Sequence, residues 1–241
     1  YPEAAKPSQR LLQVLRSLAT DSRNELLLAT GRDRATLNQW FKGVPIGLAG
    51  EHGAWIKEWN GDWKIQQTMP QDWKTKLLPI LEMFADRVTG AFVEEKEFSL
   101  VWHYRMADPA QGSAAARELA DHLVVFTASI DLQVLRGNKA IEIRNAGVNK
   151  GSAVQQWLAK NDFDFILAIG DDLTDEDMFA VVPPWAYSFR VGANRTHARF
   201  RLPSPVEVLQ ILAELAIGQE GSKTERLDRA SANPASDIPQ T

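Results

Sequence analysis

One short segment constrains the fold of this chain more than any other: an apolar strand that runs directly into a cluster of acidic residues. Residues 165–169 carry no polar side chain, and Gly170-Asp171-Asp172-Leu173-Thr174-Asp175-Glu176-Asp177 follows at once. A short run that is apolar on both faces is typical of a buried parallel strand. In open α/β folds, ligands bind at the carboxyl edge of the parallel sheet. The segment therefore predicts an α/β protein with carboxylates at its functional edge.

Strand-like and helix-like segments alternate through the whole chain, which is the pattern of a layered α/β protein. Residues 25–29 form a second short apolar strand that ends in Thr30-Gly31-Arg32-Asp33. Asn60-Gly61 lies between aromatic-rich segments and predicts a hairpin turn. The other elements that we predict outside the central region are helices over 8–19, around 37–41, over 150–160 and over 206–216, and a strand over 186–191.

The central region, residues 70–146, has the pattern of a separate unit. Its predicted order is helix, strand, strand, helix, strand, strand, and residues 98–104 alternate large apolar side chains with smaller or polar ones. We interpret this region as an α/β cap domain inserted into a core of residues 1–69 and 147–217. From Gly218 onward the composition offers almost nothing to bury, so residues 218–241 are expected to form a disordered tail.

Composition excludes several classes of protein. The chain has 241 residues, of which 44% are hydrophobic, as in a globular protein, and a net charge of -4, which argues against general nucleic-acid binding. No apolar run approaches the ~20 residues of a membrane helix, and no secretory segment stands near the start, so we expect no membrane partner and a cytoplasmic location. The absence of cysteine excludes disulfides, thiolate metal sites and a cysteine nucleophile.

The acidic loop supports two interpretations. Clustered carboxylates repel one another, and Mg²⁺, a hard cation that prefers oxygen ligands, would relieve that repulsion. Alternatively, Thr174 and Asp177 have the spacing of a helix capping box. Both can hold if Thr174 and Asp177 cap the helix while Asp171, Asp172 and Asp175 face the crevice.

Two further segments could bind phosphate. The Thr30 hydroxyl and nearby backbone N–H groups at a strand end can hold phosphate oxygens, and Arg32 can bind them bidentately. The same residues are also compatible with an ordinary strand-to-helix turn. Lys150 opens a predicted helix, where the positive helix end favours anions, although most lysines are simply solvated.

Charged residues in the central region are less specific. Glu142 and Arg144 share one face of a predicted strand, and residues 93–96 form a charged run between strands that is typical of a solvated surface. His103 lies on the face opposite Leu100 and Trp102, and a structural role is as compatible with the pattern as a functional one.

Taken together and in order, these segments resemble the trehalose-6-phosphate phosphatases, a family of the haloacid dehalogenase superfamily. The resemblance covers about residues 5–215. The segments that carry it are Thr30-Gly31-Arg32-Asp33, Glu51-His52-Gly53-Ala54, Val93-Glu94-Glu95-Lys96, His103-Tyr104-Arg105, Glu142 with Lys150-Gly151, and Gly170-Asp171-Asp172-x-Thr174-Asp175-Glu176-Asp177-Met178-Phe179.

The resemblance implies a Rossmann-like parallel-sheet core with an inserted cap and a role for each matching residue. Thr30 would bind the transferring phosphoryl group, Lys150 would neutralise its charge, and Asp171, with Asp172 and Asp175 in support, would hold Mg²⁺. The implied sugar contacts in the cap and beside the core are Arg32, His52, Glu94, Lys96 and Glu142. The implied reaction is attack by an aspartate on the phosphoryl group of trehalose 6-phosphate, release of trehalose, and hydrolysis of the aspartyl phosphate by water.

One motif of the family is absent from these residues. Asp-x-Asp-Gly-Thr, which supplies the nucleophile, a general acid/base and a Mg²⁺ ligand, would be expected just upstream of Tyr1. Its strand would lie centrally, between the strand ending at Thr30 and the strand ending at Gly170. We therefore expect residues 1–241 alone to be inactive, and either to be part of a longer chain or to be poorly stable or rearranged in the sheet.

Three functions remain open from the sequence. The first is a trehalose-6-phosphate phosphatase unit, either standing alone or fused to or partnered with a synthase. The second is a related phosphatase acting on another phosphorylated sugar, and the third is a non-catalytic phosphatase-like scaffold or regulatory module. The retained Thr30, Lys150 and acidic loop favour the enzymes over the scaffold.

Overall fold

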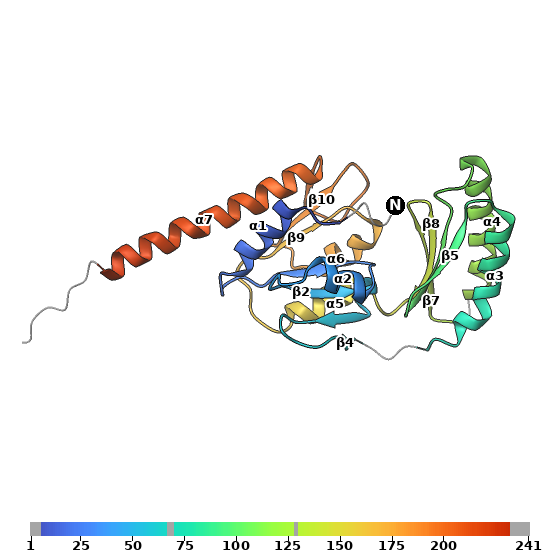
Figure 1. Cartoon of the computed structure of the whole chain (residues 1–241), viewed down its shortest axis with the longest axis horizontal. Helices are drawn as coiled ribbons and strands as arrows, with labels where there is room; N and C mark the ends of the chain where they lie inside the picture. The colour runs from blue at the N-terminus through green and yellow to red at the C-terminus, as the bar shows by residue number, and fades with distance from the viewer. Residues whose placement is uncertain (1–5, 67–69, 128–129, 232–241) are drawn as a thin grey trace, which may run out of the picture.

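The computed structural model describes residues 6–66, 70–127 and 130–231, with only the backbone described for 219–231. These residues form a larger lobe, which contains the parallel strands, and a smaller lobe built on an antiparallel sheet (Figure 1). The helices α3 (Trp73–Arg87) and α4 (Pro109–Thr127) cover the outer face of the smaller lobe's sheet (Figure 1). The predicted α/β architecture with an inserted second unit is confirmed.

The first sheet of the larger lobe has the order β1-β2-β3-β4. Helix α1 (Gln9–Ala19) begins at the predicted Ser8, whose side chain accepts a hydrogen bond from Leu11 N at 3.2 Å, and α2 (Arg34–Trp40) is capped by Asp33. The strands are β1 (Leu27–Ala29) and β2 (Gly47–Gly50), which are parallel, and β3 (Trp55–Lys57) and β4 (Lys64–Ile65), which form the predicted hairpin.

The second sheet of the larger lobe is parallel throughout and has the order β11-β10-β9. Among the described strands, β1 pairs only with β2 and β9 pairs only with β10, so the parallel strands form two sheets. Leu27 of β1 packs against the cluster that contains Ala168 of β9, which joins the two sheets through their core. The elements of this half are α5 (Lys150–Leu158), β9 (Leu167–Gly170), the short helix η3 (Leu173–Asp175), α6 (Glu176–Val181), β10 (Tyr187–Val191) and β11 (Phe200–Leu202).

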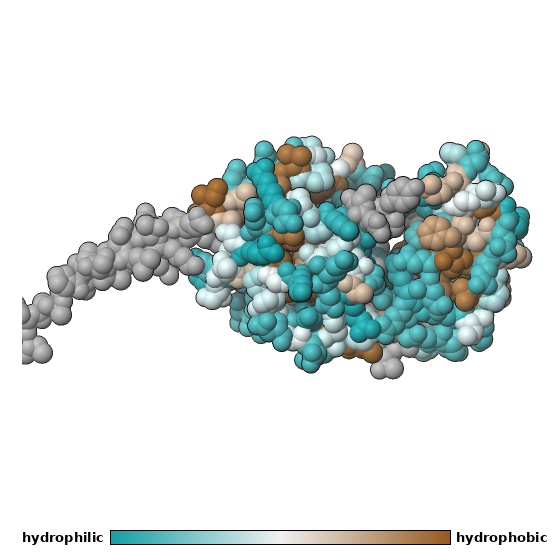
Figure 2. All heavy atoms as spheres, in the orientation of Figure 1, coloured by the Kyte–Doolittle hydropathy of each residue, from teal (hydrophilic) through white to brown (hydrophobic). Residues whose placement is uncertain are grey.

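The smaller lobe has one apolar and one polar sheet face. Its strands are β5 (Phe92–Glu95), β6 (Ser99–His103), β7 (Leu132–Gly137) and β8 (Ala140–Asn145), in the order β5-β6-β8-β7. Leu100, Trp102 and Ile143 are fully buried in the cluster that includes α3 and α4. The opposite face carries Glu142 and Arg144 toward the larger lobe, and Figure 2 shows mostly hydrophilic side chains where the two lobes meet. Residues 93–95, predicted as a charged run between strands, instead belong to β5 itself.

The chain after the last core residues differs from the prediction. Helix α7 (Pro205–Ser231) continues through residues 218–231, which were expected to be disordered (Figure 1). Eight of the 14 residues in this stretch are glutamine, glutamate, lysine, arginine, leucine or alanine, and these residue types favour a helix even where little apolar surface is available. The remaining residues of the predicted tail, 232–241, lie outside the described part of the chain. Within the described part, no helix is both long and apolar enough to cross a membrane.

Candidate active site

The carboxyl ends of three parallel strands bring the predicted segments to one edge of the larger lobe. Thr30 follows β1, the short helix η2 (Glu51–Gly53) follows β2, and the acidic loop follows β9. Two glycines allow close packing here: a Cβ at Gly31 would lie 2.4 Å from Nε2 of His52, and one at Gly53 would lie 2.8 Å from the carbonyl oxygen of Asn149. Asn149 caps α5, so Lys150, the first residue of this helix, lies beside these loops.

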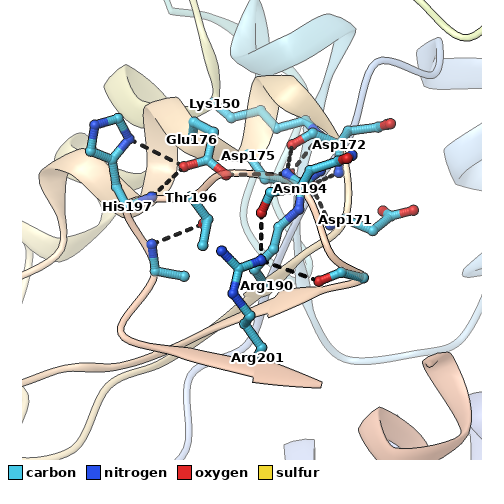
Figure 3. Close-up of polar contacts among 12 residues, drawn as sticks. Lys150, Asp171, Asp172, Asp175, Glu176, Arg190, Asn194, Thr196, His197 and Arg201 are labelled. Carbon is cyan, nitrogen blue, oxygen red and sulfur yellow. Dashed lines mark hydrogen bonds and ion pairs between the residues drawn. The ribbon is translucent and has the colours of Figure 1, made fainter. Parts of the chain in front are cut away.

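Lys150 and Asp175 form a buried ion pair. Lys150 Nζ lies 2.7 Å from Asp175 Oδ1, and the side chains are 6% and 8% exposed (Figure 3). The other oxygen of Asp175 accepts hydrogen bonds from the backbone N–H groups of Asp171 and Asp172, both at 2.8 Å. Asp175 thus shapes the acidic loop and holds Lys150 against it.

The alternative capping box is not formed as predicted. The carboxylate of Asp175, two residues earlier than Asp177, accepts the loop N–H groups. Asp177 instead pairs with Arg144 of the smaller lobe at 3.5 Å, and the Thr174 hydroxyl is buried without a hydrogen-bond partner among the described residues. The short helix η3 comes before α6, so Thr174 lies inside η3 and Asp177 lies in the first turn of α6. The two residues therefore do not cap one helix together.

Asp171 is the acidic side chain best placed to meet a cation. Although the residue is exposed, partial desolvation of its carboxyl group, reinforced by the negative charges of Asp172 and Asp175, raises the pKa of this group above the ordinary value. Among the described residues its carboxylate accepts no hydrogen bond, and Figure 3 shows it apart from the marked contacts. Within the same described set, no three acidic, histidine or cysteine side chains are grouped so that they alone could hold a metal ion.

A second buried cation, from β10, donates hydrogen bonds to the acidic loop and to the start of α6. Arg190 of β10 is 3% exposed and donates from Nη1 to the carbonyl oxygen of Asp172 at 2.6 Å and to Glu176 Oε1 at 3.1 Å. The carboxylate of Glu176 also accepts from the backbone N–H of His197 at 2.7 Å (Figure 3). This network fixes the backbone that follows β9.

Thr30 and Arg32 lie on the neighbouring loop, which follows β1. The Thr30 hydroxyl oxygen accepts a hydrogen bond from the Arg32 backbone N–H at 3.3 Å, and the Thr30 carbonyl accepts one from His52 N–H at 2.8 Å. The Arg32 guanidinium lies over the Trp40 ring, 4.3 Å from its centroid. The hydrogen bonds among the described residues include none from either side chain to Lys150 or Asp175.

Three of the predicted sugar contacts meet where the lobes join. His52 Nε2 lies 3.1 Å from Glu142 Oε2, and Lys96 Nζ donates to the carbonyl oxygen of Gly31 at 3.0 Å. Burial lowers the pKa of His52. Burial alone would raise the pKa of Glu142, but the hydrogen bond from His52 and the positive charge of Lys96 hold it at about 2. His52 also has a left-handed backbone, with φ of 59°, which is a form of strain that is frequent at functional sites.

Comparison with known proteins decides the family. The family model for trehalose-phosphatase matches residues 1–205 of this chain. The chain belongs to the trehalose-phosphatase family. A protein of Saccharomyces cerevisiae named trehalose-phosphatase is 37% identical over 258 residues, which cover 89% of this chain and 29% of that protein. A bifunctional trehalose-6-phosphate synthase/phosphatase of Thermoproteus tenax is 40% identical over 202 residues, covering 84% of this chain and 28% of that protein.

Solved structures agree with this family and its fold. The C-terminal domain of Candida albicans trehalose-6-phosphate phosphatase has a TM-score of 0.84 and 31% identity, and the match covers 90% of this chain and 86% of that one. A haloacid dehalogenase-like hydrolase of Bacillus subtilis, with a TM-score of 0.60 and 13% identity, shares the fold. The chain spans less than a third of the length of the curated relatives named above.

Several residues around this candidate site were given no role from the sequence. Arg190 carried no signal, because a single arginine on a strand is common. Glu176 lay within the acidic segment but was given no role of its own there. Arg144 was noted only for sharing a face with Glu142, yet it bridges to Asp177. Other missed contacts tie the small-lobe loop after β5 to the core: Glu51 Oε2 accepts from Phe98 N–H at 2.8 Å, and Glu97 Oε2 accepts from Arg34 at 2.7 Å and from Trp55 Nε1 at 3.2 Å.

Proposed function

We propose that this chain is the phosphatase unit of a protein that hydrolyses trehalose 6-phosphate to trehalose and phosphate. The observation that carries the proposal is the buried Lys150–Asp175 pair on the acidic loop, which lies at the edge faced by a carboxylate-bearing cap, in a chain matched to the family over residues 1–205. The proposed core is residues 1–69 and 147–217, and the proposed cap is residues 70–146. The reaction would use an aspartate nucleophile from the Asp-x-Asp-Gly-Thr motif that residues 1–241 do not contain.

Lys150 and Thr30 would bind the transferring phosphoryl group. Asp175 holds the Lys150 ammonium group at the site by an ion pair of 2.7 Å, so the cation is oriented before the substrate arrives. Among the described residues, the Thr30 hydroxyl takes part in one hydrogen bond, which it accepts from the Arg32 backbone N–H, and it can donate its proton to a phosphate oxygen. Arg32 would add a contact to the substrate by leaving its stacked position over Trp40.

The acidic loop fits Mg²⁺, which this fold family uses. Mg²⁺ is usually held by one or two carboxylates together with waters and substrate phosphate, so it does not need three protein ligands grouped in advance. The Asp171 side chain is exposed, its carboxylate accepts no hydrogen bond among the described residues, and Asp172 lies beside it. We propose that Asp171 and Asp172 hold the ion and that Asp175 supports them through the loop backbone. When bound, Mg²⁺ would neutralise charge on the phosphoryl oxygens.

The polar face of the cap would recognise the sugar. Glu94, Lys96 and Glu142 lie on or beside this face, and His52 reaches it from the core. Carboxylates accept hydrogen bonds from sugar hydroxyls, while lysine and histidine N–H groups donate to them. We propose that, when the substrate binds, Lys96 leaves the carbonyl oxygen of Gly31 and Glu142 leaves His52. Both side chains then contact the disaccharide.

We also propose a synthase domain or partner, because one relative is named as a bifunctional synthase/phosphatase. A cytoplasmic location fits the absence of cysteine, since the fold needs no oxidising compartment.

A substrate panel tests this function. The full-length protein is assayed for phosphate release from trehalose 6-phosphate, sucrose 6-phosphate, glucose 6-phosphate and p-nitrophenyl phosphate, with Mg²⁺ and after treatment with a chelator. We expect preference for trehalose 6-phosphate, loss of activity with the chelator, and rate losses of at least ~100-fold in Asp171→Asn and Lys150→Met. Glu118→Gln, a change at an exposed cap carboxylate, is the matched control and should retain wild-type rates.

Each other result has a defined meaning. Preference for a different sugar phosphate would identify a related phosphatase, and no hydrolysis by the full-length protein would favour the non-catalytic scaffold. Hydrolysis by residues 1–241 alone would contradict the proposed source of the nucleophile.

A further inference from the structure

His103 lies on the polar face of the cap, beside a residue that is proposed to contact the sugar. It is the last residue of β6, and its partner in β5 is Phe92, while Glu94 pairs with Val101. Since side chains alternate across a strand, Glu94 and His103 lie on the same face as diagonal neighbours. Glu142, which pairs with Val101 on the other side, shares this face.

The His103 ring is held on two sides. Its Nε2 lies 2.7 Å from Glu94 Oε2, and the Phe92 ring stacks on it with a centroid distance of 4.7 Å and an interplanar angle of 22°. A stacked ring with one nitrogen committed to a carboxylate has little rotational freedom. His103 therefore fixes the position of Glu94 Oε2 as well as its own.

The contact also favours the ionised form of Glu94. The hydrogen bond from His103 is the main influence that lowers the pKa of Glu94, and it outweighs the opposing effect of burial. An ionised carboxylate can only accept, so Nε2 of His103 carries the proton in this contact. Among the described residues no other hydrogen bond to the Glu94 carboxylate is formed, which leaves Oε1 available as an acceptor.

We propose that His103 is a positioning residue for sugar recognition, which holds Glu94 so that its second oxygen accepts a hydrogen bond from a hydroxyl of a disaccharide phosphate. The inference rests on the proposed function. His103 acts through Glu94 and takes no part in phosphoryl transfer, because the phosphate site is on the core at Lys150 and the acidic loop. A substrate without sugar hydroxyls makes no such contact and is therefore insensitive to His103.

The test compares two substrates in the full-length protein. With trehalose 6-phosphate, His103→Ala should raise KM about tenfold with kcat changed by less than about twofold, the effect of losing one charge-assisted hydrogen bond. With p-nitrophenyl phosphate, kcat/KM should stay within about twofold of the wild type. His103→Gln keeps an N–H donor and should recover most of the lost affinity. In a Glu94→Ala background, which lacks the carboxylate that His103 positions, His103→Ala should add less than about a twofold further rise in KM.

Controls separate this inference from the proposed function. His122→Ala changes an exposed histidine of α4 on the other side of the cap sheet and should leave both substrates unaffected. Equal losses on both substrates in His103→Ala, or an unchanged KM for trehalose 6-phosphate, would overturn the positioning role while the wild-type preference stands. A wild type that shows no preference for trehalose 6-phosphate would overturn the proposed function and the role of His103 with it.

Discussion

His52 Nε2 lies 3.1 Å from Glu142 Oε2, and this contact joins the loop after β2 of the larger lobe to β8 of the smaller one. Both side chains are mostly buried, at 10% and 15% exposed. Since burial lowers the pKa of His52, the pair consists at neutral pH of a neutral imidazole that donates to an ionised carboxylate. The position of the cap on the core is thus coupled to the protonation of one carboxylate.

The first prediction concerns the pH dependence of stability at this contact. The pKa of Glu142 is lowered from 4.5 to about 2, so its contribution to stability is present above pH 4.5 and is lost as the pH falls from there toward 2. Glu142→Gln should lower the free energy of unfolding by roughly 3 kcal/mol at pH 7, and the difference from the wild type should shrink below pH 4.5. Urea unfolding of the full-length protein across this pH range measures both effects.

The exposed carboxylate Glu118, which pairs with Arg87 on the cap helices, supplies the control. Glu118→Gln should change the free energy of unfolding by less than about 1 kcal/mol at every pH. A constant difference between wild type and Glu142→Gln from pH 7 to pH 3 would show that the contact does not depend on the charge of Glu142.

The second prediction concerns the buried Lys150–Asp175 pair. Lys150→Met leaves the Asp175 carboxylate buried without its cation, and removal of one partner of a buried pair costs about 3–5 kcal/mol. The double variant Lys150→Met/Asp175→Asn should be less destabilised than the sum of the single variants, because the second change removes the uncompensated charge. Urea unfolding of the wild type, the two single variants and the double variant measures the free energies of this double-mutant cycle. The control is Arg136→Met, which breaks the ion pair between Arg136 and Asp121. These side chains are 60% and 81% exposed, so the change should lower the free energy of unfolding by less than about 1 kcal/mol.

The third prediction concerns the glycine that precedes the acidic loop. A Cβ at Gly170 would lie 2.4 Å from Asp175 Cγ and 2.5 Å from its Oδ2. Gly170→Ala should therefore displace the Asp175 carboxylate, destabilise the protein by about 1–3 kcal/mol and lower kcat for the sugar phosphate in the full-length protein. Gly218→Ala is the matched control: no described atom lies within 4 Å of its Cβ position, and the change in helix α7 should be stabilising by about 0.5–1 kcal/mol. Equal thermal stability of the Gly170→Ala variant and the wild type would contradict this account of the loop.

The acidic loop could be predicted from sequence because its signal is local. An apolar strand followed by Gly170 and aspartates places the carboxylates at a sheet edge, and Ser8 and Asp33 begin helices where the residue types predict. The antiparallel pattern of the cap was equally readable, since Leu100 and Trp102 alternate with residues of the polar face.

Other elements could not be predicted, because their residue types suit their tertiary contacts and have little preference for one secondary structure. Strand β2 consists of Gly47, Leu48, Ala49 and Gly50, which have little preference for a strand, and Gly47 is small because a Cβ there would lie 2.2 Å from the Trp157 ring. Arg190 had no distinguishing context in sequence, although it supports the acidic loop. The pairing of His52 with Glu142 spans 90 residues and depends on how the two lobes meet.

The last prediction concerns Glu51, a second buried carboxylate between the lobes, whose pKa shifts in the opposite direction to that of Glu142. Burial raises the pKa of Glu51 above 4.5, and its Oε2 accepts a hydrogen bond from Phe98 N–H at 2.8 Å. A raised pKa means that stability from this group is greatest below pH 4.5 and is lost as the pH rises through the folded-state value. Glu51→Gln keeps an oxygen acceptor for Phe98 and removes the buried charge, so the variant should equal the wild type near pH 4 and exceed it in stability at pH 8. Glu51→Ala should be less stable than Glu51→Gln at both pH values by about 1–3 kcal/mol, because the buried Phe98 N–H loses its partner. The left-handed backbone at this position, with φ of 46°, is the same in both variants and cancels from the comparison. A Glu51→Gln variant whose stability follows the wild-type pH profile would show that Glu51 is not held against ionisation in the folded protein.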